Sequence, residues 1–176
     1  MSFFVTIAEM LLSLALAAVI LRLLLQLVRA DFRNQVAQAI VQITNPLILP
    51  LRRIFPPFGK VDTASVVAVL LLAVLHVAIV SALQGFGLLP APFWLRLVAI
   101  VILRTTLQIY LYALLIYSLL SFIAQGNGGA PVQALLHALC DPVLRPFRRI
   151  IPPIANIDFS PLWAGIIIVG LLSLLH

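Results

Sequence analysis

Paired arginines next to prolines are the residues of this chain with the clearest chemical potential, and they occur twice. The first copy reads NPLILPLRRIFPPFGKVD over residues 45–62, and the second reads DPVLRPFRRIIPPIANID over residues 141–158. The copies align without a gap at a constant offset of 96 positions. A guanidinium group can hold a phosphate or a carboxylate through two parallel hydrogen bonds. We therefore predict a lipid- or partner-binding site made of Arg52, Arg53, Arg145, Arg148, Arg149, Pro56, Pro57, Pro152 and Pro153.

Two other interpretations of the motif remain open. Arginines beside apolar segments also act as anchors that fix which side of a membrane a loop occupies. The acidic and amide residues of the motif are expected at helix N-termini, where their side chains accept hydrogen bonds from free backbone N–H groups. Alternatively, the two aspartates at the ends of the copies pair with arginines of their own copy or of the other one. The predicted caps are Asn45, Asp62, Asp141 and Asp158.

The composition indicates that these motifs belong to a membrane protein. Of the 176 residues, 64% are hydrophobic and 9% are charged, whereas soluble domains carry about 25% charged residues. A net charge of +6 would suggest nucleic acid as the partner of a soluble protein. Here the arginines adjoin apolar segments, so we predict orientation in a bilayer and no direct contact with nucleic acid. The single cysteine, Cys140, excludes a disulfide within the chain.

Four apolar segments are predicted to cross the membrane as helices. They cover residues 3–28, 63–83 and 95–124, and a last segment that runs from Ser160 to the C-terminus. A helix needs about 20 apolar residues to cross a bilayer, so the last segment, with about 15–17, is at the short limit. Arg22, near the end of the first segment, is expected to extend its side chain to the interface.

A segment that contains both polar and apolar residues precedes each copy of the motif. Residues 31–44 and 131–140 carry apolar residues at helical spacing, which predicts amphipathic helices lying in the membrane interface. A separate short helix is expected to follow each of them, with Asn45 or Asp141 as its cap and the next proline in its first turn. The paired prolines at the end of the motif should stop that helix.

The order of elements is the same in both halves, which predicts two repeats, residues 1–90 and 91–176. Each repeat contains a span, an interfacial helix, a Pro-Arg loop and a second span. Because an even number of crossings separates the two loops, both lie on one side. Basic residues gather in these loops, so the positive-inside rule places them in the cytoplasm and both termini outside. The predicted fold is an all-α membrane protein with four transmembrane helices as two parallel repeats.

Three ionisable residues are predicted within the spans, at about 9–14 Å below the outer boundary. They are Glu9, His76 and Arg104. Because a charge at that depth costs a few kcal/mol without a partner, we expect Glu9 and Arg104 to pair inside the bundle, with His76 close by. The alternative is that Glu9 and Arg104 each extend outward to the interface without a partner.

The doubled motif Asx-Pro-x-x-x-Pro-x-Arg-Arg-Ile-x-Pro-Pro, followed by an aspartate that opens an apolar segment, resembles the YggT family, also called YlmG. The resemblance covers both halves and implies a small multi-pass protein of the bacterial inner membrane, with relatives in chloroplasts. Relatives are linked to cell division, to osmotic-stress tolerance, to nucleoid distribution in plastids and, in one plastid branch, to haem attachment on a cytochrome b. The copies differ where Leu49 of the first matches Arg145 of the second.

The sequence contains no G-x-S-x-G, H-E-x-x-H, P-loop or C-x-x-C-H motif. We therefore predict a non-enzymatic membrane scaffold or assembly factor that uses no cofactor and no metal. The predicted partners are the lipid bilayer with its anionic lipids, a membrane or division protein, and a second copy of this chain. Two alternatives are a small ion channel or transporter, and a haem-maturation factor with His76 or His137 as a transient ligand.

Overall fold

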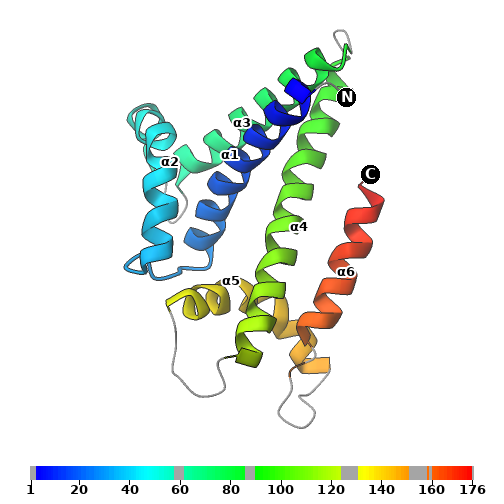
Figure 1. The fold of residues 1–176 in the computed structure, drawn as a ribbon. Coiled ribbons are helices and arrows are strands. Elements are labelled where there is room, and N and C mark those ends of the chain that lie inside the picture. Colours follow the sequence, from blue (N-terminus) through cyan, green and yellow to red (C-terminus); the bar gives the residue numbers. More distant parts are fainter. Residues whose placement is uncertain are drawn as a thin grey trace. The chain divides into compact units, whose positions relative to one another are not determined.

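The computed structural model consists of helices joined by shorter segments, as Figure 1 shows. It describes residues 3–57, 62–85, 90–123, 131–150, 158 and 160–175. No residue in these ranges belongs to a β-strand, which confirms the prediction of an all-α protein. Pro152 and Pro153, two predicted binding residues, lie outside the described residues. The helices are α1 (Phe3–Leu27), α2 (Gln35–Ile54), α3 (Thr63–Leu83), α4 (Ala91–Ile123), α5 (Pro131–Ile150) and α6 (Ser160–Leu174).

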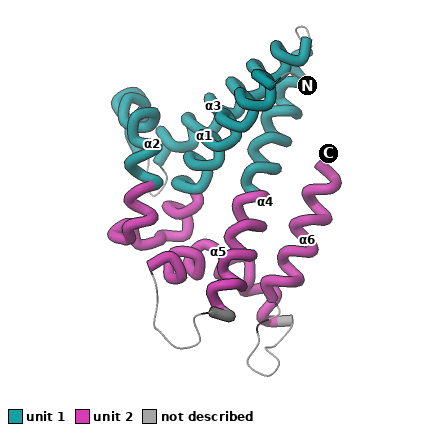
Figure 2. Tube along the Cα trace, viewed as in Figure 1, with its two compact units in different colours: residues 1–23, 40–106 teal, residues 24–39, 107–176 magenta. Residues whose placement is uncertain are grey.

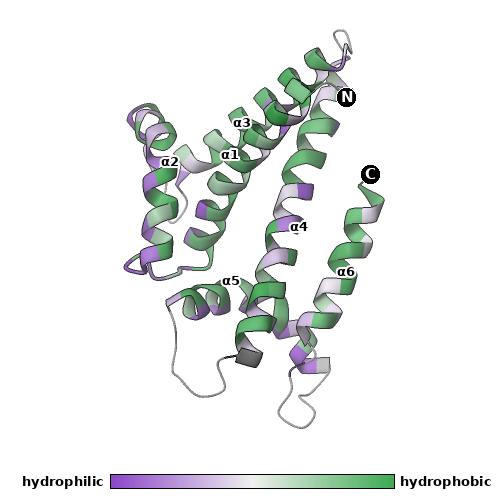
Figure 3. Cartoon of the chain, in the orientation of Figure 1, coloured by the Kyte–Doolittle hydropathy of each residue, from purple (hydrophilic) through white to green (hydrophobic). Residues whose placement is uncertain are grey.

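Within the described residues, three helices are long and apolar enough to cross a membrane: α1, α3 and the part of α4 that covers Ala91–Ser121. Figure 3 shows hydrophobic residues along most of α1 and α3, and a mixture of hydrophobic and polar residues along α2. Helix α6 is also apolar but has only 15 residues. A helix of that length rises about 23 Å, less than the roughly 30 Å of a hydrocarbon core. The helices indicate a membrane protein with three candidate spans and one shorter apolar helix.

The interfacial segment and the proline-containing segment form one continuous helix in each half, and the prediction of two helices is wrong. Asn45 and Pro46 lie inside α2, and Asp141 and Pro142 lie inside α5, so Asn45 and Asp141 are not caps. An internal proline removes one backbone hydrogen bond. These prolines are exposed, so water or neighbouring polar groups can bond the carbonyl that each one leaves free. Helix α5 has the bounds of α2 displaced by 96, since 131 is 35 plus 96 and 150 is 54 plus 96.

Helix α2 begins at Gln35 rather than at residue 31, because side chains of the preceding turn bond to the backbone. Asp31 Oδ1 accepts a hydrogen bond from the N–H of Arg33, and Asn34 Oδ1 accepts one from the N–H of Val36, each at 2.9 Å. Such local bonds compete with helix formation and then satisfy the free N–H groups at a helix start. Asn34 is therefore the N-cap residue of α2.

The chain divides into two compact units, which Figure 2 colours separately. Unit 1 comprises residues 1–23 and 40–106, and unit 2 comprises residues 24–39 and 107–176. In unit 1, α3 contributes small buried residues that let helix backbones approach closely, the usual packing mode in membranes; they include Ala64, Ser65, Ala68 and Ala73. The buried residues of unit 2 include several larger apolar side chains: Leu114, Leu135, Leu139, Leu144 and Ile168.

Candidate functional site

In the first copy of the motif, Arg52 and Asp62 form an ion pair in which two guanidinium nitrogens face the carboxylate. Arg52 Nη2 lies 2.6 Å from Asp62 Oδ2, and Arg52 Nε donates to the same oxygen at 3.1 Å. The hydroxyl of Ser65 also donates to this oxygen, at 2.8 Å. The side chain of Asp62 is 1% exposed and that of Arg52 is 41% exposed. The pair therefore ties the last turn of α2 to the start of α3.

The second copy forms the corresponding pair, between Arg148 and Asp158. Arg148 Nε lies 2.9 Å from Asp158 Oδ2. The two residues are ten positions apart, as Arg52 and Asp62 are. Here both side chains are about one-third exposed, so the carboxylate of the second pair is more open to water than that of the first. It ties the last turn of α5 to the start of α6.

Arg148 has two further acceptors, and one of them is shared with Arg145. Arg148 donates to Asp141 Oδ1 at 3.4 Å and to the hydroxyl of Tyr117, on α4, at 3.2 Å. Asp141 Oδ2 accepts from Arg145 Nε at 2.7 Å. Asp141, which the sequence predicted as a helix cap, is thus a counter-ion for two arginines of α5. The Arg145 side chain remains largely exposed, and surface pairs of this kind contribute about 0–1 kcal/mol.

Asp62 and Asp158 stand where the sequence predicts caps, but their side chains are used differently. Asp62 occupies the N-cap position of α3 without a cap hydrogen bond from its side chain. Asp158 Oδ1 accepts a hydrogen bond from the N–H of Ser160, the first residue of α6, at 2.9 Å. Pairing with an arginine of the same copy therefore occurs in both copies, whereas a hydrogen bond from the backbone of the following helix to the aspartate side chain is found, among the described residues, only in the second.

The hydrogen bonds to these two carboxylates favour their ionised form. Burial raises the pKa of Asp62, but the hydrogen bonds from Arg52 and Ser65 outweigh burial, and the pKa lies below its usual value. For Asp158, burial again raises the pKa, and the hydrogen bonds from Ser160 and Arg148 bring it below the usual value. A carboxylate with a lowered pKa stabilises the folded protein at neutral pH.

Arg53 and Arg149 are exposed motif arginines without an ion-pair partner among the described residues, so their guanidinium groups can bind a ligand. Each follows the paired arginine of its copy and is exposed. Within the part of the chain that the structure describes, neither forms an ion pair or a side-chain hydrogen bond. The predicted binding set is therefore divided: Arg52, Arg145 and Arg148 are engaged by carboxylates, while the exposed Pro56 and Pro57 follow the end of α2.

Sequence reasoning missed the role of Arg22, which is 5% exposed. Instead of extending to the interface, its Nη1 donates to Thr44 Oγ1 at 2.8 Å, to Asn45 Oδ1 at 3.0 Å and to the carbonyl of Val41 at 3.3 Å. These bonds join α1 to the middle of α2, next to the first internal proline. The available signal was an arginine inside an apolar span, since such a residue needs acceptors within the protein.

The predicted cluster of ionisable residues within the spans is only partly assembled. His76 is 8% exposed, and its Nδ1 has no hydrogen-bond partner among the described residues. Glu9 is close enough to interact electrostatically with His76. Arg104 is exposed on α4, and the described residues contain no ion pair between Glu9 and Arg104. The predicted pair does not form here, because an exposed arginine can reach polar surroundings through its long side chain.

Cys140 is fully buried in α5, and burial raises the pKa of its thiol to about 12. Because the thiolate is the reactive form, we expect a soluble maleimide to label Cys140 in the folded protein at least about tenfold more slowly than in sodium dodecyl sulfate. An Arg53→Cys variant, with an exposed thiol, provides the positive control. Equal labelling of Cys140 in folded and unfolded protein would contradict its burial in α5.

No metal site is evident in the described ranges. These residues include no group of three or more histidine, cysteine, aspartate or glutamate side chains that could hold a metal ion. The ion pairs of these residues join arginines and carboxylates, and two of them, Arg52–Asp62 and Arg148–Asp158, connect the end of one helix to the start of the next. The arrangement supports binding and structural roles, and nothing in it indicates a catalytic step.

Apolar helices, two internally paired arginine motifs and exposed arginines beside them define a small helical membrane protein. The family described as CCB3/YggT matches residues 1–83 and 97–176 of this chain. The chain therefore belongs to the CCB3/YggT family, and the resemblance seen in the doubled motif is confirmed.

Several bacterial relatives cover most of the chain. An uncharacterized protein of Pseudomonas aeruginosa is 39% identical over 155 residues, which cover 86% of this chain and 77% of the relative. The uncharacterized protein YggT of Escherichia coli (strain K12) is 34% identical over 143 residues, with coverages of 81% and 73%. A protein of Vibrio alginolyticus is 40% identical over 151 residues, with coverages of 85% and 80%. No solved structure matches the chain. These relatives support the family assignment, but their names state no activity.

Proposed function

We propose that this chain is a non-enzymatic scaffold or assembly factor of the bacterial inner membrane, which binds acidic segments of partner proteins through Arg53 and Arg149. The observation that carries the proposal is the equivalence of the two copies: in each, one arginine is paired with an aspartate, and the next arginine has no partner among the described residues. The ion pairs hold the helix ends from which the free arginines project. Such preorganisation reduces the entropy that binding costs.

The proposed topology has four spans in two parallel repeats, with both motif copies in the cytoplasm and both termini outside. Helices α3 and α4 lie between Arg53 and Arg149 in the chain and are both candidate spans. If both cross, the two arginines share one side whether or not α6 crosses. The excess of arginine in these segments favours the cytoplasmic side. Cell division, membrane organisation and osmotic-stress tolerance are the processes in which we propose such a scaffold acts.

Affinity capture in mild detergent, after crosslinking in cells, tests this proposal. The wild type is compared with a double variant, Arg53→Ala with Arg149→Ala, and with Arg96→Ala, an exposed arginine of α4 outside the motif. We expect the same membrane or division proteins with the wild type and Arg96→Ala, and a loss of about tenfold or more with the double variant, as for interfacial charge pairs. Partners that are captured equally by all three would contradict the proposed role of the motif.

A small channel or transporter is the second candidate, and the buried His76 favours it. Ionisable residues inside spans often mark ion or proton pathways, and Glu9 is within electrostatic range of His76. Flux of protons and potassium into liposomes that contain the purified protein distinguishes the candidates. Flux that His76→Ala abolishes would favour the channel, whereas the scaffold predicts liposomes no leakier than empty ones.

A further inference from the structure

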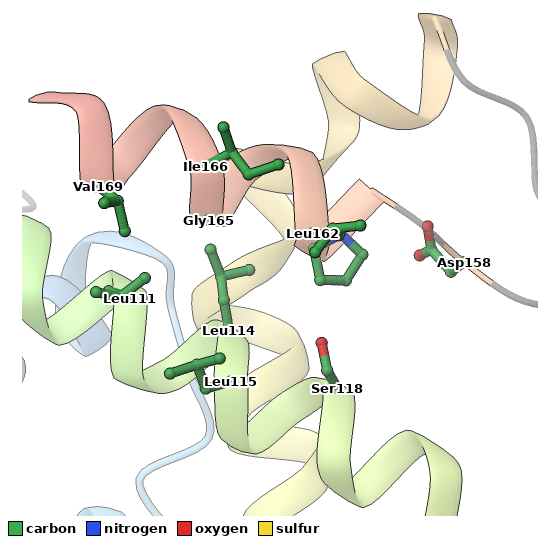
Figure 4. A pocket seen from close by; sticks show the side chains of 10 residues that line it. Leu111, Leu114, Leu115, Ser118, Asp158, Leu162, Gly165, Ile166 and Val169 are labelled. Carbon is green, nitrogen blue, oxygen red and sulfur yellow. The ribbon is translucent and has the colours of Figure 1, made fainter.

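Unit 2 contains an open groove between α4 and α6, with a cavity volume of about 650 Å³. Figure 4 shows its walls. Leucines of α4 form one side, and Leu162, Ile166 and Val169 of α6 form the other. The lining residues of α6 extend from Pro161 to Val169, which is about 12 Å along a helix. The groove therefore suits an extended apolar chain that lies parallel to α6, and its volume is typical of sites for small molecules.

The groove has a polar end, which lies where α6 begins. Figure 4 shows Asp158 at this end, with the hydroxyl of Ser118 near it. The Asp158 carboxylate accepts one hydrogen bond at each oxygen, from the N–H of Ser160 and from Arg148 Nε, both at 2.9 Å. A carboxylate has about four acceptor sites, and the Asp158 side chain is about one-third exposed. It can therefore accept further hydrogen bonds, and the Ser118 hydroxyl, which bonds to no other described residue, can donate or accept one.

The charged groups bonded around Asp158 balance one another. Two arginines and two carboxylates make up the set: Arg145, Arg148, Asp141 and Asp158. A balanced set gives no net attraction to a ligand with an excess of either charge. The better match is a ligand without net charge that donates hydrogen bonds to the carboxylate lining the groove.

We propose that this groove holds one acyl chain of phosphatidylethanolamine, whose ammonium group donates a hydrogen bond to the carboxylate of Asp158. Apolar walls along α6 match the chain, and an acceptor at the start of that helix matches an N–H donor in the head group. Phosphatidylcholine has the same net charge, but its trimethylammonium group has no N–H to donate. A helix of a second copy is a poorer match, because apolar side chains over this end would bury the free acceptor sites of Asp158. The proposal goes beyond the scaffold function and does not involve Arg53 or Arg149.

Native mass spectrometry of the detergent-solubilised full chain tests the head group without any substitution. The protein is mixed with equal amounts of dioleoyl phosphatidylethanolamine and dioleoyl phosphatidylcholine, and retained lipid is read from the mass. We expect one bound lipid per chain, with phosphatidylethanolamine preferred about tenfold, the factor expected for one hydrogen bond to a charged group. The N,N-dimethyl derivative of phosphatidylethanolamine keeps one N–H and should be retained more like the parent lipid than like phosphatidylcholine.

Substitution of the acceptor tests the role of Asp158. Asp158→Asn should abolish the preference between the two lipids and leave some binding of both. Asp141→Asn is the matched control, since Asp141 is also a carboxylate partner of Arg148 but does not line the groove. It should keep the preference. If Asp158→Asn does not fold, as judged by circular dichroism, the dimethyl and trimethyl lipids with the wild type decide the question.

Variants of α6 test whether the acyl chain occupies the groove. Gly165 lines it, and a Cβ there would come no closer than 4.0 Å to Leu111. Gly165→Phe should fill the groove and abolish retention of both lipids. Gly170→Phe is the matched control, since nothing lies within 4 Å of a Cβ at Gly170. Val169→Trp, at an exposed lining position, replaces Gly165→Phe if that variant does not fold.

Four outcomes would overturn the proposal. The first is equal retention of phosphatidylethanolamine and phosphatidylcholine by the wild type. The second is stronger retention of dioleoyl phosphatidylglycerol than of phosphatidylethanolamine, which would assign the groove to an anionic lipid. The third is unchanged lipid retention by a folded variant that fills the groove. The fourth is a dimer mass that Gly165→Phe abolishes while no lipid is bound, which would assign the groove to a second copy. Partner capture by the Arg53 and Arg149 variants is a separate result, so the scaffold proposal and the lipid site can fail independently.

Discussion

Arg52→Ala is expected to destabilise the protein by about 3 kcal/mol, the lower end of the range for breaking a buried ion pair. Among the described residues, the substitution leaves the carboxylate of Asp62, which is 1% exposed, with the hydroxyl of Ser65 as its one hydrogen-bond donor. Arg52 is itself partly exposed, which is why we expect the lower end of the range. The free energy of unfolding, measured by titration with sodium dodecyl sulfate in mixed micelles, gives the loss directly.

The neighbouring residue provides the matched control for this effect. Arg53→Ala removes the same side chain from the next position, where it is exposed and has no recorded partner among the described residues. We expect a change within about 0.5 kcal/mol. Arg52→Lys should lie between the two variants, because lysine keeps the charge but loses the two-nitrogen fork. Equal losses for Arg52→Ala and Arg53→Ala would show that the Asp62 pair does not stabilise the fold.

Acidification is expected to weaken both motif copies together. The pKa values of Asp62 and Asp158 lie below their usual value of 3.8. Groups with lowered pKa contribute stability that is present above the unfolded value and is lost as the pH falls through the folded value. The unfolding free energy should therefore hold between about pH 7 and pH 5 and fall steeply below about pH 4. Unfolding titrations at a series of pH values measure this curve.

Isosteric variants identify which carboxylates produce the acid loss. The double variant Asp62→Asn with Asp158→Asn should be less stable than the wild type at neutral pH and should lose most of the dependence below pH 4. Asp31→Asn is the control, since Asp31 is exposed and has no ion pair in the described residues. A double variant that keeps the full acid dependence would assign it to other groups.

Features with a strong periodic or compositional signal were predicted well from the sequence. The span predicted for residues 63–83 has those bounds in the structure, because a long apolar run has only one reasonable interpretation. The offset of 96 positions between the motif copies reappears in the bounds of α2 and α5. Each copy of the motif also contains aspartates and arginines, and pairing within a copy is one of the interpretations that the sequence leaves open.

The errors arise where tertiary contacts override local preferences. Asn45 followed by proline has the local signature of a helix start, yet α2 continues through it. The hydrogen bonds from Arg22 to Thr44 and Asn45 hold that turn to α1. Because these residues are more than 20 positions apart in the chain, no local sequence pattern predicts the bonds. Likewise, the choice between capping and pairing for Asp62 depends on where the chain goes after Pro57, which the sequence does not reveal.

The side of the membrane on which the two free arginines lie tests the account most directly. Arg53→Cys and Arg149→Cys, each made together with Cys140→Ser, are treated with a membrane-impermeant maleimide in intact spheroplasts and in inverted membrane vesicles. We expect both thiols to react in inverted vesicles and neither to react in spheroplasts. Labelling of the two positions from opposite sides, or of both from the outside, would contradict a scaffold whose two motif copies both face the cytoplasm.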